Sequence, residues 1–143
     1  MAESPEWVIQ GVLARSSRPG YPDEAAPCET VETWLNKVRA MGVNSVVCLL
    51  SADQLAYYDA LPGGLLDCYR RYGLTVEDIP ITDPAHDGRG KRELEQSLGR
   101  IHESFGRLTK PVLVHCSAGI DRTGAAVRYI QQRLKSGSRG DAA

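Results

Sequence analysis

The segment from His115 to Gly124 reads HCSAGIDRTG and places a thiol and a guanidinium at the two ends of a short loop. The thiol of Cys116 becomes a nucleophile once it loses its proton. The guanidinium of Arg122 is planar and can bind two oxygens of one phosphate, which a lysine would do less well. The spacing of these two residues therefore predicts attack of a thiolate on a bound phosphate.

The residues on either side of this loop predict the elements that hold it. Residues 111–114, PVLV, are typical of a buried strand, and residues 125–134 have the pattern of a helix. A helix N-terminus offers free backbone N–H groups and a partial positive charge, so a loop that enters it tends to bind anions. We expect the loop amides to surround one phosphate. The expected phosphate-binding residues are Ser117, Ala118, Gly119, Ile120, Asp121 and Arg122.

Two neighbouring side chains are expected to support the nucleophile. A helix N-terminus and a nearby cation make a cysteine ionise more readily, which favours the thiolate of Cys116. The His115 ring and the Thr123 hydroxyl can orient the loop or donate a hydrogen bond to the sulfur. Such a bond would also ease the departure of the sulfur as a leaving group.

The motif His-Cys-x-x-Gly-x-x-Arg-Thr-Gly at residues 115–124 resembles the signature loop of the cysteine-dependent protein tyrosine phosphatase superfamily. The small chain resembles the compact dual-specificity-like branch, because the classical phosphotyrosine-specific domains are far longer. Residues 116–120 nevertheless read like the classical version of the loop. The resemblance implies a phosphatase-like α/β fold, a cysteinyl-phosphate intermediate, no metal or other cofactor, and an aspartic acid on a movable loop upstream.

Three aspartates compete for the role of proton donor to the leaving group: Asp78, Asp83 and Asp87. The same carboxylate can then deprotonate the water that hydrolyses the thiophosphate. Residues 79–83, IPITD, resemble the family's segment in which the acid follows a hydrophobic strand, and Pro84 stiffens the exit. This resemblance favours Asp83. Asp87, in a glycine-rich segment, stays the alternative, and Asp78 is interpreted as a solvated or loop-edge charge.

The composition is that of one soluble globular domain. The chain has 143 residues, of which 42% are hydrophobic and 24% charged, with a net charge of −1. We expect a phosphatase domain over residues 1–135 and a flexible tail over 136–143. The net charge gives no overall basic field that would attract nucleic acid. No apolar run approaches the roughly 18 residues of a membrane span. The acidic N-terminus lacks a targeting pattern. We expect a cytoplasmic monomer that does not insert into membranes.

The four cysteines fit neither a close metal-ligand spacing nor a dense disulfide framework, since they stand at positions 28, 48, 68 and 116. A catalytic thiol also needs reducing surroundings. Cys48 lies in the run VVCLL, which predicts a buried strand near the strand that precedes Cys116. Core packing is favoured for Cys48, and a protective disulfide with Cys116 is left open.

Strands and helices alternate along the chain, which predicts a mostly parallel central sheet with helices on both faces. In that fold the active loop lies at the carboxyl end of a strand. A helix over residues 31–41 is expected to have Thr30 as its N-cap and Gly42 as its stop. The other expected elements are strands at 7–9, 11–14, 45–50 and 74–81, and helical segments at 52–60, 65–72 and 94–108.

These residues predict a phosphoric monoester hydrolase in which Cys116 attacks, Arg122 binds the phosphate and Asp83 donates the proton. The expected substrate is phosphotyrosine in a protein or peptide, with phosphoserine and phosphothreonine left open because pocket depth decides between them. One alternative keeps the loop and changes the substrate to a phosphoinositide or an RNA 5′-phosphate. Loops that favour highly phosphorylated inositides often carry lysines, whereas Asp121 would repel additional phosphates. The other alternative is a non-catalytic phosphate-binding module.

Overall fold

A five-stranded sheet forms the centre of the computed structural model, which describes residues 5–84 and 88–142, with side chains up to residue 136. The strand order is β1-β2-β5-β3-β4. Only β1 runs antiparallel to its neighbour, so the predicted mostly parallel sheet is confirmed. The strands are β1 (Glu6–Ile9), β2 (Leu13–Ser16), β3 (Ser45–Cys48), β4 (Thr75–Asp78) and β5 (Val112–His115).

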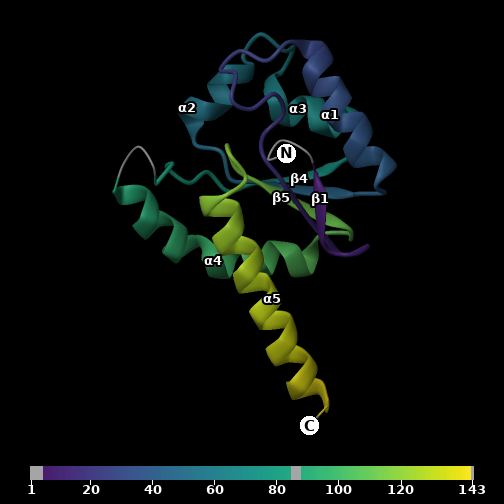
Figure 1. Cartoon of the computed structure of the whole chain (residues 1–143), viewed down its shortest axis with the longest axis vertical. Coiled ribbons are helices and arrows are strands. Elements are labelled where there is room, and N and C mark those ends of the chain that lie inside the picture. The colour runs from purple at the N-terminus through teal and green to yellow at the C-terminus, as the bar shows by residue number, and fades with distance from the viewer. Residues whose placement is uncertain (1–4, 85–87, 143) are drawn as a thin grey trace.

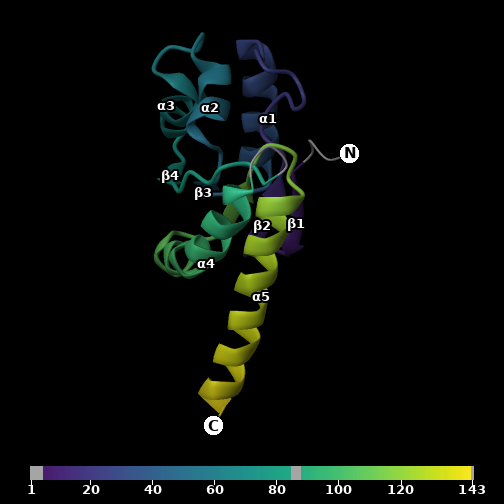
Figure 2. The ribbon, with the colours of Figure 1, turned by 90° about the vertical axis from the view of Figure 1, so that its left-hand side faces the viewer.

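Helices cover both faces of this sheet, as predicted (Figures 1 and 2). On one face lie three α-helices, with a short 3-10 turn at Ala56–Tyr58. They are α1 (Cys28–Ala40), α2 (Ala52–Leu55) and α3 (Gly64–Arg71). The opposite face carries α4 (Arg89–Arg107) and α5 (Asp121–Ala142). The chain is therefore a small α/β domain of three layers, in agreement with the predicted fold class.

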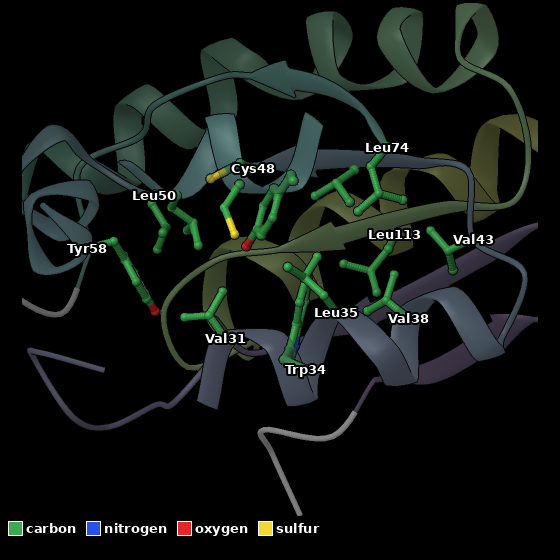
Figure 3. Close-up of a cluster of buried hydrophobic side chains, with 14 of the residues drawn as sticks. Val31, Trp34, Leu35, Val38, Val43, Cys48, Leu50, Tyr58, Leu74 and Leu113 are labelled. Carbon is green, nitrogen blue, oxygen red and sulfur yellow. The ribbon is translucent and has the colours of Figure 1, made fainter. Parts of the chain in front are cut away.

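The alternation of side chains along β3 divides the core in two. Val46 and Cys48 pack toward α1 and α3, whereas Val47 and Leu49 pack toward α4 and α5. Successive residues of a strand point to opposite faces, so a strand covered on both faces is apolar throughout. Figure 3 shows the first of these clusters, in which Trp34, Leu35 and Val38 of α1 point toward the strands.

The first helix begins earlier than its sequence pattern suggested. α1 starts at Cys28, so Thr30 lies inside its first turn and is not the N-cap that we expected. The cap position belongs to Pro27, whose ring fixes φ near the value of −63° found there. Gly42 ends the helix as expected, with a φ of +85° that favours glycine.

The last helix is longer at both ends than the expected span of 125–134. α5 begins at Asp121, and its first helical hydrogen bond joins the Gly124 N–H to the Ile120 carbonyl at 2.8 Å. Arg122 and Thr123 therefore belong to its first turn. The backbone is helical through Ala142 and extends away from the other elements in Figures 1 and 2. The flexibility assigned to residues 136–143 stays a prediction.

The segments that leave the parallel strands meet at the carboxyl edge of the sheet. The Arg18 N–H donates to the Ser117 carbonyl at 2.9 Å, which ties the exit of β2 to the loop after β5. The Leu49 N–H donates to the His115 carbonyl at 2.9 Å, and the Ile81 N–H donates to the Leu49 carbonyl at 3.3 Å. Ligand sites of open α/β sheets form at this edge.

Helix α4 packs its first turn against the segment that contains Asp83. A Cβ atom added at Gly90 would overlap the Thr82 carbonyl oxygen and would lie 2.8 Å from the Pro84 nitrogen. Gly90 therefore allows a backbone approach that any other residue would prevent. Gly99, in the same helix, has no atom within 4 Å of such a Cβ.

We expect Gly90→Ala to lower the free energy of unfolding by roughly 1–3 kcal/mol, because the added methyl must push α4 away from the Thr82 backbone. The matched change Gly99→Ala should raise it by roughly 0.5–1 kcal/mol, because alanine favours an exposed helix position. Urea unfolding of the two variants and the parent measures both effects. Equal stabilities of the two variants would contradict the close packing.

Candidate active site

The predicted phosphate loop joins the end of β5 to the start of α5. Cys116 directly follows β5 and is 2% exposed, so its thiol lies at the buried base of the loop. Gly119 has a φ of +76°, and a Cβ there would lie 2.7 Å from the Ser17 nitrogen. The loop therefore rests directly on the backbone that follows β2, and only glycine fits this contact.

Arg122 lies buried at the first turn of α5, with 1% of its surface exposed. Its Nη1 group donates to the Leu49 carbonyl at 3.2 Å, to the Ile81 carbonyl at 2.9 Å and to the Gln54 Oε1 at 2.8 Å. Its Nη2 group donates to Asp83, and its Nε has no hydrogen-bond partner among the described residues. One side of the guanidinium is thus fixed, and the other retains N–H groups for an oxyanion.

Asp83 lies directly beside Arg122. Its Oδ2 accepts from Arg122 Nη2 at 3.1 Å and from Gln54 Nε2 at 2.9 Å. The carboxylate is 17% exposed and serves as the counter-charge of the buried guanidinium. The structure therefore brings together two of the three residues predicted for catalysis by a direct ion pair.

Of the other two candidate aspartates, Asp78 lies within the described residues. Asp78 ends β4, and its Oδ1 is buried with no hydrogen-bond partner among the described residues. Burial raises the pKa of its carboxyl group, so of the two expectations, a solvated or a loop-edge charge, the position at the end of β4 agrees with the second. Asp87 lies outside the described residues.

A cavity of about 240 Å³ opens over the loop. Its lining includes Ser117, Ala118 and Asp121 of the loop, together with Asp83. Arg18 and the aromatic rings of Tyr21 and Tyr57 also line it. The cavity thus combines residues of the loop, a carboxyl group and two aromatic rings.

Comparisons with known proteins give a consistent answer. A family model described as the tyrosine phosphatase family matches residues 80–137, a span that contains Asp83, Cys116 and Arg122. Among solved structures, the chain is similar to kinase-associated phosphatase with its catalytic-site cysteine substituted by serine. The TM-score is 0.56 at 17% identity, and the match covers 82% of this chain and 65% of that one. No curated protein sequence matches the chain.

Over residues 80–137 the chain is similar to the tyrosine phosphatase family, and this similarity supports a protein of the cysteine-dependent tyrosine phosphatase type. The family match covers Asp83 and the whole loop from Cys116 to Arg122, and the structural match shows a similar fold. The chain spans 65% of the length of the solved phosphatase that it matches. In the part of the chain that the structure describes, no cluster of side chains could hold a metal ion, and no helix is long and apolar enough to cross a membrane.

The residue before Cys116 is a fully buried histidine. His115 Nδ1 lies 3.1 Å from the Cys116 carbonyl, which can only accept, so Nδ1 carries the proton and donates. The Nε2 atom then accepts from the Tyr69 hydroxyl at 2.9 Å, and the Trp34 ring packs edge-on at 5.6 Å. Burial lowers the pKa of His115 to about 4, so this ring is neutral near pH 7.

The structure assigns His115 to the backbone of the loop and leaves Thr123 free. Neither side chain hydrogen-bonds the Cys116 sulfur among the contacts of the described residues. The Thr123 Oγ1 atom is buried and has no hydrogen-bond partner there. A buried hydroxyl without a partner is costly, and a nearby thiolate would satisfy it.

Gln54 is a site residue that sequence reasoning missed. It is 4% exposed, and its amide bridges the other two groups: Oε1 accepts from Arg122 while Nε2 donates to Asp83. Its own position is fixed by a capping box with Ser51 at the start of α2. The Ser-x-x-Gln spacing predicts this capping box. It does not indicate that the Gln54 amide contacts Arg122 and Asp83.

Arg18 is the second residue that was missed. It is 2% exposed, and its Nε donates to the Ser117 hydroxyl at 3.0 Å. Its guanidinium lies over the Tyr57 and Tyr21 rings, at 4.8 and 5.5 Å from their centres. No described carboxylate forms a salt bridge with it. Arg18 therefore holds the first residue of the phosphate loop after Cys116 and adds positive charge to the cavity wall.

The two cysteines considered for a disulfide pack on opposite faces of the sheet. Cys48 belongs to the cluster below α1 and α3, and Cys116 to the cluster with α5. Both are free, and burial raises the pKa of Cys48 to about 12. This arrangement agrees with core packing for Cys48. The disulfide with Cys116 stays an open alternative, since Cys48 pairs in register with His115, the residue before Cys116.

We expect the free energy of unfolding to fall as the pH drops from 6.5 to about 4, because the unfolded chain binds the His115 proton more readily than the folded one. The stabilisation by the neutral His115 ring is fully present above pH 6.5. Roughly 3 kcal/mol of it is lost by pH 4. His115→Gln should flatten that slope in urea unfolding. His102→Gln, which removes a half-buried histidine of α4, should leave it unchanged. Equal slopes for His115→Gln and the parent would contradict a buried neutral ring.

Proposed function

We propose that this protein hydrolyses phosphoric monoesters, with phosphotyrosine in proteins or peptides as its substrate. The observation that carries this proposal is the environment of Arg122. Three acceptors fix its Nη1 group, which leaves Nε and a hydrogen of Nη2 to bind two oxygens of one phosphate. The same guanidinium lies beside the carboxyl group that the reaction needs.

The proposed reaction has two steps. The Cys116 thiolate attacks phosphorus, and the bond to the ester oxygen breaks as Asp83 donates its proton to that oxygen. Water then attacks the cysteinyl phosphate, Asp83 accepts the proton of the water, and the sulfur leaves as a thiolate with release of inorganic phosphate. Arg122 and the loop amides stabilise the charge on the phosphoryl group throughout.

The ion pair between Asp83 and Arg122 suggests how the acid is prepared. Without substrate, the carboxylate neutralises the guanidinium at 3.1 Å. A phosphate dianion on the same guanidinium competes for this cation and repels the carboxylate. Protonation of Asp83 removes that repulsion, so substrate binding favours the form that can donate. Gln54 keeps the carboxyl group close during this exchange, because its amide bonds both partners.

The cavity supports an aryl phosphate more than a multiply phosphorylated substrate. The rings of Tyr21 and Tyr57 offer an apolar wall to a phenyl group. The exposed carboxylate of Asp121 lies at the edge of the cavity, where it would repel a second phosphate. We also propose that the protein is a cytoplasmic monomer of the compact dual-specificity-like branch.

We expect phosphotyrosine peptides to be hydrolysed faster than phosphoserine peptides, phosphoinositides or RNA 5′-phosphates when all are assayed with chelator present. Cys116→Ser should abolish turnover and still bind vanadate, because Arg122 and the loop amides remain. Phosphate release and oxyanion titration measure the two properties. If a phosphoinositide or an RNA 5′-phosphate were hydrolysed faster, that class would replace phosphotyrosine as the proposed substrate. Binding without turnover in the parent would identify a phosphate-binding module.

We expect Asp83→Asn to lower kcat by roughly 10²–10⁴ for a phosphotyrosine peptide, because its leaving group needs a proton. The loss should be much smaller for an aryl phosphate whose phenolate leaves unprotonated. Phosphate should bind this variant at least as well as the parent, since the competing carboxylate is gone. Asp78→Asn is the matched control outside the site. A leaving-group-dependent loss in Asp87→Asn, with none in Asp83→Asn, would exchange the two roles.

A further inference from the structure

A second hollow lies beside the catalytic cavity, between the first turns of α4 and α5. Its volume is about 610 Å³, and we call it the α4–α5 groove. Its lining combines apolar and charged residues. The residues that define it are Lys91, Leu94, Ile120, Asp121, Ala125 and Arg128.

The apolar part of the groove depends on an unusual side chain of the phosphate loop. Ile120 is 61% exposed, and no other large hydrophobic residue in the described part of the chain is exposed. It stands next to the apolar surfaces of Leu94 and Ala125 in the same lining. An exposed isoleucine beside an apolar floor gains free energy when another apolar group covers it.

The sides of the groove carry positive charge without ion partners. Neither Lys91 nor Arg128 forms a salt bridge with any described residue. The guanidiniums of Arg128 and Arg15 lie 3.2 and 3.7 Å from the position that a Cβ of Gly124 would take. Within the groove lining, Lys91 and Arg128 outnumber the single carboxylate of Asp121, so an acidic side chain is favoured on the side of the two cations.

The groove is continuous with the catalytic cavity. Asp121 borders both, and Ile120 belongs to the phosphate loop itself. Pro84, the residue after Asp83, lies on the rim of the groove. A ligand in the groove therefore lies next to a phosphoryl group bound over Cys116. One molecule can occupy both places.

We infer that the α4–α5 groove binds the residues next to the phosphotyrosine of a protein substrate. An apolar side chain packs on Ile120 and Leu94, and an acidic residue beside it contacts Lys91 and Arg128. This inference rests on the proposed function, because it takes a peptide as the molecule whose phosphate lies over Cys116. The charge of the groove then selects among phosphotyrosine sequences.

The test uses phosphotyrosine peptides of one length that carry Leu-Glu, Ser-Glu, Leu-Lys or Ser-Lys on the amino or the carboxyl side. The groove variant is Lys91→Glu with Arg128→Glu. The control is Arg92→Glu with Arg133→Glu, which makes the same charge change at two exposed positions of the same helices outside the groove. Each is assayed for kcat/KM with peptides and with a small aryl phosphate. The Cys116→Ser form of each is assayed for peptide binding.

We expect the parent to prefer Leu-Glu, and the groove variant to shift the ratio of Glu to Lys peptides by roughly tenfold toward Lys. The control should shift it by less than about twofold, and the aryl phosphate should be hydrolysed equally by all three proteins. Equal responses of groove and control variants, or no flank preference in kcat/KM or in binding, would overturn the inference. Selective loss of activity toward phosphoinositide vesicles in the groove variant would assign the groove to a lipid instead.

A protein without activity on the aryl phosphate would contradict the proposed function alone. Peptide binding by the Cys116→Ser forms would still decide on the groove, because binding needs no turnover. Retained flank preference in binding would then support the groove, and its absence would overturn it.

Discussion

The site is organised around one buried guanidinium. Arg122 is a full positive charge placed away from water, and such a charge is tolerated only when hydrogen-bond acceptors and a counter-charge surround it. Its acceptors come from the exits of β3 and β4 and from α2, and its counter-charge comes from Asp83. Satisfying this single group therefore draws together segments that are distant in sequence. The arrangement that makes the arginine acceptable in the core is the same one that prepares it to bind an oxyanion.

The ion pair also separates two demands on the carboxyl group. Folding favours Asp83 as an anion beside a cation, whereas the proposed chemistry needs it as an acid. In the proposed reaction, the bound phosphate resolves this conflict because it takes the place of the carboxylate as counter-charge. The charge of the site then changes little between the empty and the occupied state, which limits the electrostatic cost of holding a guanidinium in the core.

The sequence predicted the architecture and the loop well, for a physical reason. Strand and helix patterns are local, and the apolar runs around Cys48 and Val112 can only be buried strands between two helical layers. The phosphate loop is likewise a contiguous motif. The predicted N-terminus of α1 was wrong. The hydroxyl of Thr30 suggested an N-cap there, whereas Pro27, with its fixed φ, occupies the cap position.

The residues that escaped prediction come from elsewhere in the chain. Gln54 and Arg18 reach the loop from α2 and from the exit of β2, at sequence separations of 68 and 99 residues. A glutamine in a capping box and an arginine before a proline have many ordinary uses, so their types carry no specific signal. Only the sheet topology, which brings the strand exits together, turns them into parts of a site.

The close contact of Gly119 with the backbone after β2 has a consequence for how the molecule assembles. The hydrogen bond from Arg15 to the Gly119 carbonyl joins residues 104 positions apart, so two distant segments must meet before the phosphate loop is complete. Chain closure over such a distance loses entropy before the contacts compensate it. During synthesis, the hairpin of β1 and β2 therefore lacks its neighbouring strand until β5 has left the ribosome. The contacts that hold Gly119 against the backbone after β2 therefore form only once β5 and the start of α5 have been made.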